Sequence, residues 1–316
     1  MASPPKSNLF TFCLVLILLG INTLQADALV RPNTPNFSVP LDLKPSLANA
    51  PLDRAINYAD HCHVQQNQVT TTAPCIYGDT HSKTTVVLFG DSHALAWFPA
   101  LNALAKVRHW KLYSQTMSSC NPADMKMWNI KTKEMMINCP IWREGAIKRI
   151  IKADPMFILM AGTRGFQTEN TDGSIASAEQ MHQIWDDAIK QTIKRFDDAL
   201  LTSIIISDVP ITGPDPISCL KDNPKSSIAC AFPVSKAIDQ GWLDTERNVS
   251  TESGVPLIEP QSWVCPTSPC PAIIGKTLVY LDSGHMTATF SATLSKRLGA
   301  AIDSALDGLT SKVSKD

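Results

Sequence analysis

Short apolar runs that alternate with helical patterns constrain the fold of this chain more than any other feature. The runs at 84–89, 156–160 and 203–207 are apolar or β-branched, as in strands buried on both faces of a parallel sheet. Shorter runs at 111–115 and 278–281 predict two further strands. Helical patterns occur at residues 94–107, 142–153, 178–200 and 291–306. The alternation predicts an α/β protein with a mostly parallel sheet covered by helices on both sides.

Residues 1–28 have the pattern of a secretory signal. Lys6 provides a positive charge, residues 9–21 form an apolar stretch, and Ala26-Asp27-Ala28 fits a small-x-small cleavage site. The alternative is an uncleaved anchor helix, but the apolar stretch is shorter than the roughly 20 residues that span a bilayer, which favours cleavage. In either case the body of the protein is expected to be secreted or held at the outer face of the cytoplasmic membrane.

Two proline-rich stretches show no regular period. Residues 29–55 are rich in Pro, Asn and Ser and predict a flexible arm. Residues 210–260 are rich in Pro and Ser and predict loops that carry one short helix. We assign residues 56–310 to one domain, because 44% of the chain is hydrophobic and can build a large core.

The cysteines favour export and disulfide formation. The chain has nine, and eight remain when Cys13 of the signal is set aside. An even number of cysteines in an exported protein indicates disulfides, and these eight fall into four sequential couples, each within one predicted loop. The predicted pairs are Cys62–Cys75, Cys120–Cys139, Cys219–Cys230 and Cys265–Cys270.

A metal site is the alternative use of these cysteines. Residues 60–63 (Asp-His-Cys-His) form the best candidate cluster, with Cys75 or the couple Cys265 and Cys270 as further ligands. The cluster lacks the Cys-x-x-Cys spacing that is typical of structural zinc sites. We therefore expect no metal ion, and nothing else in the sequence calls for a cofactor.

Charge and hydropathy exclude two broad classes of protein. There are 28 basic and 29 acidic residues, and the resulting net charge of −1 argues against nucleic acid as a partner. The single long apolar stretch argues against a membrane protein with several spans.

Three polar segments follow predicted strands, at 90–93 (Gly-Asp-Ser-His), 161–164 (Ala-Gly-Thr-Arg) and 282–285 (Asp-Ser-Gly-His). The carboxyl ends of parallel strands meet at one edge of a sheet, where α/β proteins place their sites. We therefore expect these three segments to lie close together.

Ser92, His285 and Asp282 supply the parts of a nucleophilic site. A serine hydroxyl is a weak nucleophile until a base takes its proton, and imidazole can do so near neutral pH. A carboxylate then orients the ring, and the spacing of three residues lets one turn present Asp282 and His285 together. The simpler alternative is that Asp91 or Ser92 only caps a helix and the other two are ordinary loop residues. His93 is expected to fix the turn.

These segments resemble the SGNH (GDSL-like) hydrolase superfamily, and more closely the SGNH domain fused to bacterial membrane acyltransferases of family 3, the sugar O-acyltransferases. The resemblance implies a three-layer, flavodoxin-like fold and a Ser-His-Asp mechanism, with Ser92 as nucleophile, His285 as base and Asp282 as its orienting carboxylate. It extends from about Cys62 to the last predicted helix. The matching pieces are 75–79 (CIYGD), 86–94 (VVLFGDSHA), 120–122 (CNP), 204–220 (IIISDVPITGPDPISCL) and 280–286 (YLDSGHM).

Two departures from the family pattern bear on the mechanism. Arg164 stands where the superfamily has an Asn donor, so the expected oxyanion donor is the Ser92 N–H, with Arg164 or Asn121 as helpers. The chain also lacks the multi-span part that is thought to bring acyl groups across the membrane in the fused proteins. A separate membrane acyltransferase is therefore expected as acyl donor, unless the protein only removes acyl groups.

Three functional hypotheses follow. The favoured one is an exported O-acyltransferase or esterase that moves an acyl group, with acetyl as the first choice, on or off cell-envelope carbohydrate through an acyl-Ser92 intermediate. The second is a catalytically silent protein that keeps the fold and binds carbohydrate or a partner, which the changed Asn block favours. The third is an exported metal-dependent enzyme that uses residues 60–63.

Overall fold

The computed structural model describes residues 38–71, 73–129, 132–170 and 172–313, and the signal predicted at residues 1–28 lies outside these ranges. Within them, a seven-stranded sheet has the strand order β1–β4–β3–β7–β8–β9, and β2 pairs antiparallel with β4. All other pairs in this sheet are parallel, which confirms the predicted α/β class. The strands are β1 (His63–Val64), β2 (Ile76–Gly78), β3 (Thr85–Gly90), β4 (Lys111–Met117), β7 (Phe157–Ala161), β8 (Ser203–Ile206) and β9 (Leu257–Ile258).

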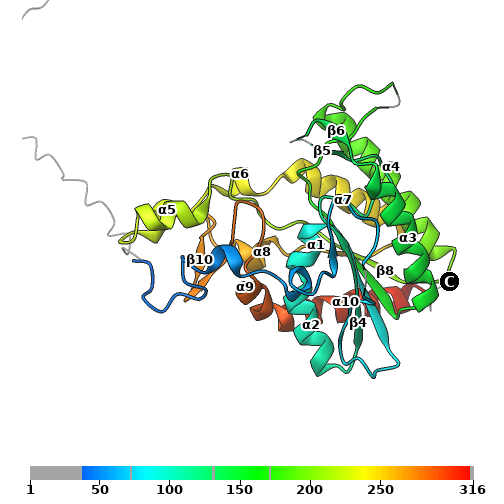
Figure 1. The fold of residues 1–316 in the computed structure, drawn as a ribbon, viewed down its shortest axis with the longest axis horizontal. Coiled ribbons are helices and arrows are strands. Elements are labelled where there is room, and N and C mark those ends of the chain that lie inside the picture. Colours follow the sequence, from blue (N-terminus) through cyan, green and yellow to red (C-terminus); the bar gives the residue numbers. More distant parts are fainter. Residues whose placement is uncertain (1–37, 72, 130–131, 171, 314–316) are drawn as a thin grey trace, which may run out of the picture. The chain divides into compact units, whose positions relative to one another are not determined.

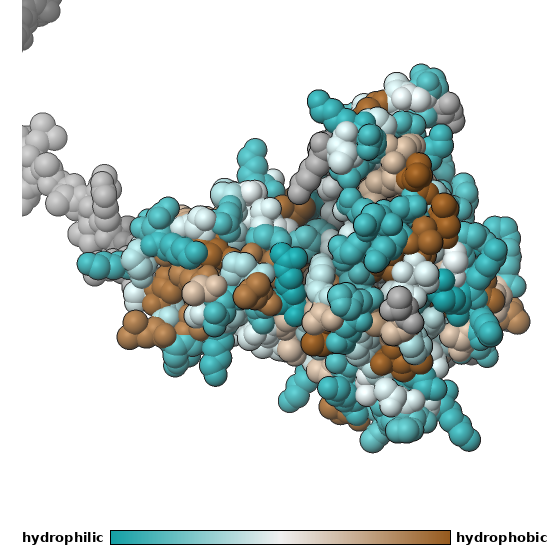
Figure 2. Space-filling model, viewed as in Figure 1, coloured by the Kyte–Doolittle hydropathy of each residue, from teal (hydrophilic) through white to brown (hydrophobic). Residues whose placement is uncertain are grey.

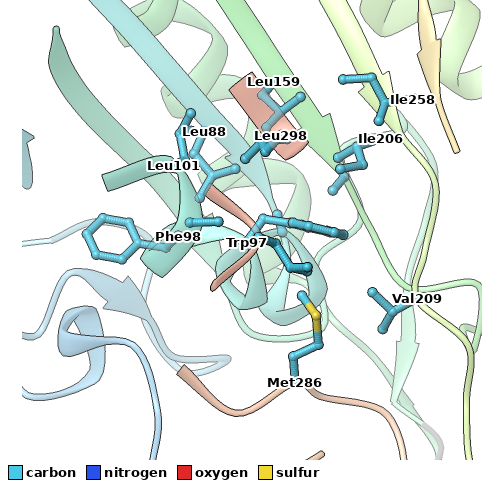
Figure 3. Packing of buried hydrophobic residues seen from close by; sticks show 14 of the residues in the cluster. Leu88, Trp97, Phe98, Leu101, Leu159, Ile206, Val209, Ile258, Met286 and Leu298 are labelled. Carbon is cyan, nitrogen blue, oxygen red and sulfur yellow. The ribbon is translucent and has the colours of Figure 1, made fainter. Parts of the chain in front are cut away.

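Successive residues of the central strands point into two different cores, as the pleat of a sheet requires. Val86 and Leu88 of β3 belong to one core, and Val87 and Phe89 belong to the other. Figure 3 shows the first core from close by. It is covered by α1 (Ser92–Ala96), α2 (Phe98–Val107), α9 (Ala288–Thr293) and α10 (Ser295–Val313). The second is covered by α3 (Asn138–Ala153), α4 (Ala178–Asp197) and α7 (Gln240–Ser253), which completes the predicted three layers (Figure 1).

The order of the strands fixes where a site can form. The five strands β4, β3, β7, β8 and β9 lie in this order across the sheet. Of these five, β3 comes first in the chain, and it lies between β4 and β7. This is the flavodoxin-like order, and it reverses between β3 and β7. This order places the loops that follow β3 and β7 side by side at the carboxyl edge of the sheet, where ligands bind in this class of fold.

The last strand of the sheet was predicted wrongly. The sequence predicts a strand at 278–281, but β11 (Thr277–Leu278) pairs antiparallel with β10 (Ile273–Ile274), outside the central sheet. The edge beside β8 is instead taken by β9, from the stretch predicted to consist of loops. A strand of two residues that follows Pro256 has no detectable period, and this explains the error.

The stretch 210–260 is also more helical than predicted. It contains α5 (Pro216–Asp222), α6 (Val234–Ala237) and α7 as well as β9. The buried apolar side chains of α7 are Trp242, Leu243 and Val249, too few for a clear helical stripe.

Prolines and caps decide where the remaining helices begin and end. The helix predicted at 94–107 is divided between α1 and α2 at Trp97, two residues before Pro99, which has no N–H to continue the bonding. The helix predicted at 291–306 is divided between α9 and α10 at Leu294, and α9 begins earlier, at Ala288, because the Thr287 hydroxyl accepts the Phe290 N–H.

Four disulfides hold the loops around the sheet, as predicted. The bonded pairs are Cys62–Cys75, Cys120–Cys139, Cys219–Cys230 and Cys265–Cys270. Each closes a loop of between 5 and 19 residues, which restricts the unfolded chain more than the folded one.

Residues 38–55, the described part of the predicted flexible arm, pack against the domain. Leu43 and Ala50 are buried in a small third core, and the Lys44 N–H donates to the Lys276 carbonyl at 2.9 Å. Asp53 accepts two backbone N–H groups at the start of α9. An extended, proline-rich segment has no period but can still bury single apolar residues and pair its backbone, so this part differs from the linker expected.

Among the residues that the structure describes, no helix is both long and apolar enough to cross a bilayer. On the face drawn in Figure 2, hydrophobic residues lie in small patches among hydrophilic ones. Apolar surface scattered in this way is normal for a folded domain and does not by itself indicate a partner.

Candidate active site

The turn between β3 and α1 presents Ser92 at the carboxyl edge of the sheet. Gly90 has a φ of 147°, and a Cβ there would lie 1.8 Å from the Ala161 carbonyl oxygen, so only glycine fits. Asp91 is fully buried and accepts the N–H groups of His93 and Thr163, both at 2.8 Å. Asp91 therefore caps α1 and ties the turn after β3 to the loop after β7.

Ser92, His285 and Asp282 form one continuous hydrogen-bonded chain. His285 Nε2 lies 2.9 Å from Ser92 Oγ, although the two residues are 193 positions apart. His285 Nδ1 lies 2.9 and 3.0 Å from the two carboxylate oxygens of Asp282. The three predicted residues thus meet in the arrangement that a serine nucleophile, a base and its orienting carboxylate require.

The turn 282–285 holds this carboxylate in its charged form. Burial alone would raise the pKa of Asp282, but the hydrogen bond from His285 and the backbone N–H groups of Gly284 and His285 lower it to about 2. The Asp282 and His285 side chains keep 41% and 30% of their surface exposed. A charged, oriented carboxylate next to a solvent-accessible imidazole favours proton transfer at neutral pH.

The predicted oxyanion helpers are both engaged in other contacts. The Arg164 guanidinium donates to the Ala237 carbonyl, and the Asn121 amide donates to the Thr163 carbonyl at 3.1 Å. The His93 N–H is taken by Asp91. Ser92 is the first residue of α1, where backbone N–H groups have no acceptor within the helix, so its N–H remains the predicted oxyanion donor.

Comparison with protein families identifies the chain. Residues 61–300 match the family described as "SGNH domain (fused to AT3 domains)". The protein belongs to this SGNH family. No curated protein sequence matches the chain.

Solved structures resemble this chain at low sequence identity, and the first of them shows the same fold. The SGNH domain is similar to the lipopolysaccharide acetyltransferase periplasmic domain of Salmonella ser. Paratyphi A, with 18% identity, a TM-score of 0.60, and coverage of 82% of this chain and 97% of that one. A GDSL-like lipase from Bacteroides thetaiotaomicron VPI-5482 has 12% identity and a TM-score of 0.42, with coverage of 70% of this chain and 89% of the lipase. A mutant of an acetyl-xylooligosaccharide esterase from Geobacillus Stearmophilus has 11% identity and a TM-score of 0.40, with coverage of 71% of this chain and 96% of the esterase.

A small, mainly apolar cavity lies beside Ser92 and His285 in this SGNH domain. Its volume of about 20 Å³ is close to the space of one or two water molecules. Arg54 and Tyr58, from the segment before β1, stand in its wall, with the Arg54 guanidinium carbon 5.4 Å from the centre of the Tyr58 ring. The apolar lining residues are Ala55, Leu95, Ala96, Pro99, Leu281, Met286 and Ala288. Neither residue was predicted at the site, because Arg54 lies in the predicted arm and Tyr58 lies just after it.

A second His–Asp pair lies directly behind the site. His93 Nδ1 is 2.6 Å from Asp208 Oδ1, and the His93 ring centre is 4.6 Å from that of His285. Burial would lower the pKa of His93, but the Asp208 carboxylate outweighs it and raises the pKa to about 9. Asp208 was not predicted as a site residue. Its position after the strand predicted at 203–207 was the available signal, since sites gather at the carboxyl ends of strands.

The residues of the alternative metal cluster have other partners in the SGNH domain. Cys62 is bonded to Cys75, and His63 bonds Thr116 Oγ1 at 2.9 Å and Ser118 Oγ at 3.0 Å. Burial lowers the pKa of His63 to about 3, so this ring is neutral. In the part of the chain that the structure describes, no group of three His, Cys, Asp or Glu side chains is arranged to hold a metal ion.

Proposed function

We propose that this protein is an exported serine-dependent O-acyltransferase or esterase that acts on acyl groups of cell-envelope carbohydrate. One observation carries the proposal: a hydrogen-bonded chain runs from Ser92 through His285 to Asp282, and its Ser92 end borders a small apolar cavity. Membership in the SGNH family supports ester chemistry.

In the first half of the reaction, Ser92 Oγ attacks the carbonyl carbon of the ester while His285 Nε2 takes the hydroxyl proton. Asp282 stabilises the imidazolium that forms, and its low pKa keeps it charged throughout. The Ser92 N–H faces the oxyanion of the tetrahedral intermediate. The C–O bond to the alcohol then breaks, His285 returns the proton to the leaving oxygen, and an acyl-Ser92 remains.

In the second half, a hydroxyl group attacks the acyl-Ser92 carbonyl and His285 takes its proton. When the attacking group is water, the acyl group is released as a carboxylate and the protein is an esterase. When it is a sugar hydroxyl, the acyl group is transferred. Which of the two occurs depends on how well the bound acceptor excludes water from the acyl-enzyme.

The substrate and the compartment are part of the proposal. The Salmonella domain with the same fold belongs to a lipopolysaccharide acetyltransferase, which supports acetyl as the acyl group and envelope carbohydrate as the acceptor. The family description, which refers to fusion with AT3 domains, supports a separate membrane acyltransferase as acyl donor. Four disulfides support an oxidising compartment outside the cytoplasm.

Turnover of p-nitrophenyl acetate and of acetylated glycans by Ser92→Ala tests the proposal. We expect a loss of about 10⁴-fold or more in kcat, because the nucleophile is absent. Ser262→Ala is the matched control, since Ser262 is exposed, and it should keep wild-type turnover. Intact mass after incubation with the esters should show an acyl adduct on the wild type only.

The same experiment separates an enzyme from a silent binding protein. A fluorophosphonate probe should label the wild type and fail to label Ser92→Ala. A wild-type protein that binds acetylated glycans, resists the probe and turns over no ester would favour the silent protein. Unchanged turnover in Ser92→Ala would remove Ser92 from the mechanism.

A further inference from the structure

His93 and Asp208 come from different elements and meet behind the proposed base. His93 is the second residue of α1, directly after Ser92, and Asp208 follows β8. Asp208 Oδ1 also accepts its neighbour Val209 N–H at 2.8 Å, and Oδ2 accepts the Arg164 N–H at 3.1 Å. Asp208 is therefore held on both oxygens and fixes the His93 ring by its Nδ1.

The turn that carries His285 rests on this pair. The two imidazole rings lie 4.6 Å apart at an angle of 51°. A Cβ on Gly284 would lie 3.4 Å from His93 Cε1, so the backbone of the turn runs next to the ring. From the Asp208 side, the Thr212 N–H donates to the Ser283 carbonyl at 2.9 Å.

The buried Asp208 carboxylate gives His93 a fixed charge. The side chains of His93 and Asp208 are only 10% and 2% exposed, and a buried carboxylate at 2.6 Å favours a protonated imidazole. Consistent with this geometry, the pKa of His93 is raised to about 9. The other charged or titratable groups around the pair are Asp91 of the β3 turn, Asp282 and His285 of the facing turn, Tyr280 before that turn, Arg164 after β7 and Glu246 of α7.

We propose that His93, held by Asp208, is a positioning residue for His285: its ring fixes the orientation of the base, and its positive charge disfavours protonation of the base before the substrate arrives. This inference rests on the proposed function, since it assigns a support to the base of that mechanism. The two ring centres are 4.6 Å apart, so a cation on His93 opposes a second positive charge on the His285 ring, and loss of that cation should make the ring easier to protonate.

Two variants separate the ring from the charge. His93→Asn places an amide near Nδ1, where it can still donate to Asp208, but removes both the ring and the charge. His93→Phe keeps a ring against His285 and removes the charge and the donor. His109→Asn is the matched control, because His109 Nδ1 also bonds a carboxylate, Asp79, at 3.0 Å, but the side chain is 81% exposed.

The readout is the pH profile of kcat/KM for p-nitrophenyl acetate, measured with the full-length protein. In both variants the acidic limb should move to higher pH, so that kcat/KM at pH 6 falls by about tenfold. His93→Asn should in addition lower the plateau at high pH, because the ring no longer positions His285. His109→Asn should match the wild type at every pH. A folded His93→Asn with an unchanged limb and plateau would overturn the proposal.

Nitrogen NMR of the wild-type histidines tests the inference without turnover or a variant. Both His93 nitrogens should stay protonated at pH 7, and a neutral His93 at pH 7 overturns the proposed charge. Failure of the proposed function looks different, because then no ester is turned over by the wild type. The protonation state of His93 can still be measured in that case and still decides whether it carries the proposed charge.

Discussion

Two His–Asp pairs lie against each other at the carboxyl edge of the sheet, and they differ in burial. In the site pair, His285 and Asp282, the side chains are 30% and 41% exposed, and the second ring nitrogen meets Ser92. In the buried pair, His93 and Asp208, they are 10% and 2% exposed. Both pairs join a histidine Nδ1 to a carboxylate.

This difference shows how the same combination of histidine and aspartate can serve two different tasks. A histidine that reaches solvent and a hydroxyl can take up and release a proton within a reaction cycle. A histidine enclosed with its carboxylate is held in one protonation state, because the buried carboxylate would be left unpaired if the proton departed. The site pair is therefore suited to chemistry and the buried pair to support.

The largest expected difference between the pairs is catalytic. His285→Ala should lower kcat for p-nitrophenyl acetate by about 10⁴- to 10⁶-fold, because Ser92 loses its base. The effect of His93→Asn at its plateau should stay below about 10²-fold, since a positioning residue touches no reacting atom. Thermal unfolding of both variants checks that they are folded. Equal losses in the two variants would contradict the division of tasks.

The carboxylates should repeat this difference on a smaller scale. Asp282→Asn should lower kcat by about 10⁴-fold, because the amide favours the wrong tautomer of His285 and cannot stabilise its charged form. Asp208→Asn keeps the shape behind the site and should lower kcat by less than about 10²-fold. Steady-state kinetics at pH 8 measure both. A larger catalytic loss in Asp208→Asn than in Asp282→Asn would reverse the assignment of the two pairs.

Sequence reasoning found the site pair because its spacing is local. Asp282 and His285 are three residues apart, whereas His93 and Asp208 are separated by 115 positions, and no short pattern joins them. The site turn was nevertheless predicted for a partly wrong reason. It was expected to follow a strand of the central sheet, but β11 lies outside that sheet.

The parts of the fold that could be predicted have strong periods. Strands β3, β7 and β8 are continuous apolar runs, and α4 has a full apolar stripe with a capping box at Ser177. By contrast, β9 has two residues, and the segment with Arg54 is held by backbone bonds and single buried side chains. Such contacts depend on the tertiary structure and leave no pattern in the sequence.

Removal of a carboxylate by alanine should change stability in the opposite order to catalysis. Asp208→Ala leaves His93 buried without its partner, and breaking a buried pair in this way costs about 3–5 kcal/mol in the free energy of unfolding. Asp282→Ala removes a partly exposed group, so its effect should be smaller, about 1–2 kcal/mol. Urea denaturation at pH 7 measures both values. If Asp282→Ala proved the less stable protein, burial would not be what distinguishes the pairs.

The last comparison is the pH dependence of stability, in which the two pairs act at opposite ends of the pH range. Folding raises the pKa of His93 from 6.5 to about 9, so its contribution is complete below pH 6.5 and is lost as the pH rises through 9. The full loss is on the order of 3 kcal/mol. Folding lowers the pKa of Asp282 from 3.8 to about 2, so its contribution is present above pH 3.8 and is lost as the pH falls through 2.

One other buried group acts in the alkaline window and has to be separated. Burial raises the pKa of Glu246 from 4.5 to about 8, so this residue also lowers the stability of the folded protein as the pH rises from 4.5 to about 8. Urea denaturation between pH 6 and pH 9.5 should therefore be compared for Glu246→Gln and for Glu246→Gln combined with His93→Asn. The single variant should still lose stability above pH 8, and the double variant should lose much less. If the free energy of unfolding fell equally steeply with pH above pH 8 in both variants, His93 would release no proton in that range. The buried pair would then lack the charge that distinguishes it from the site pair.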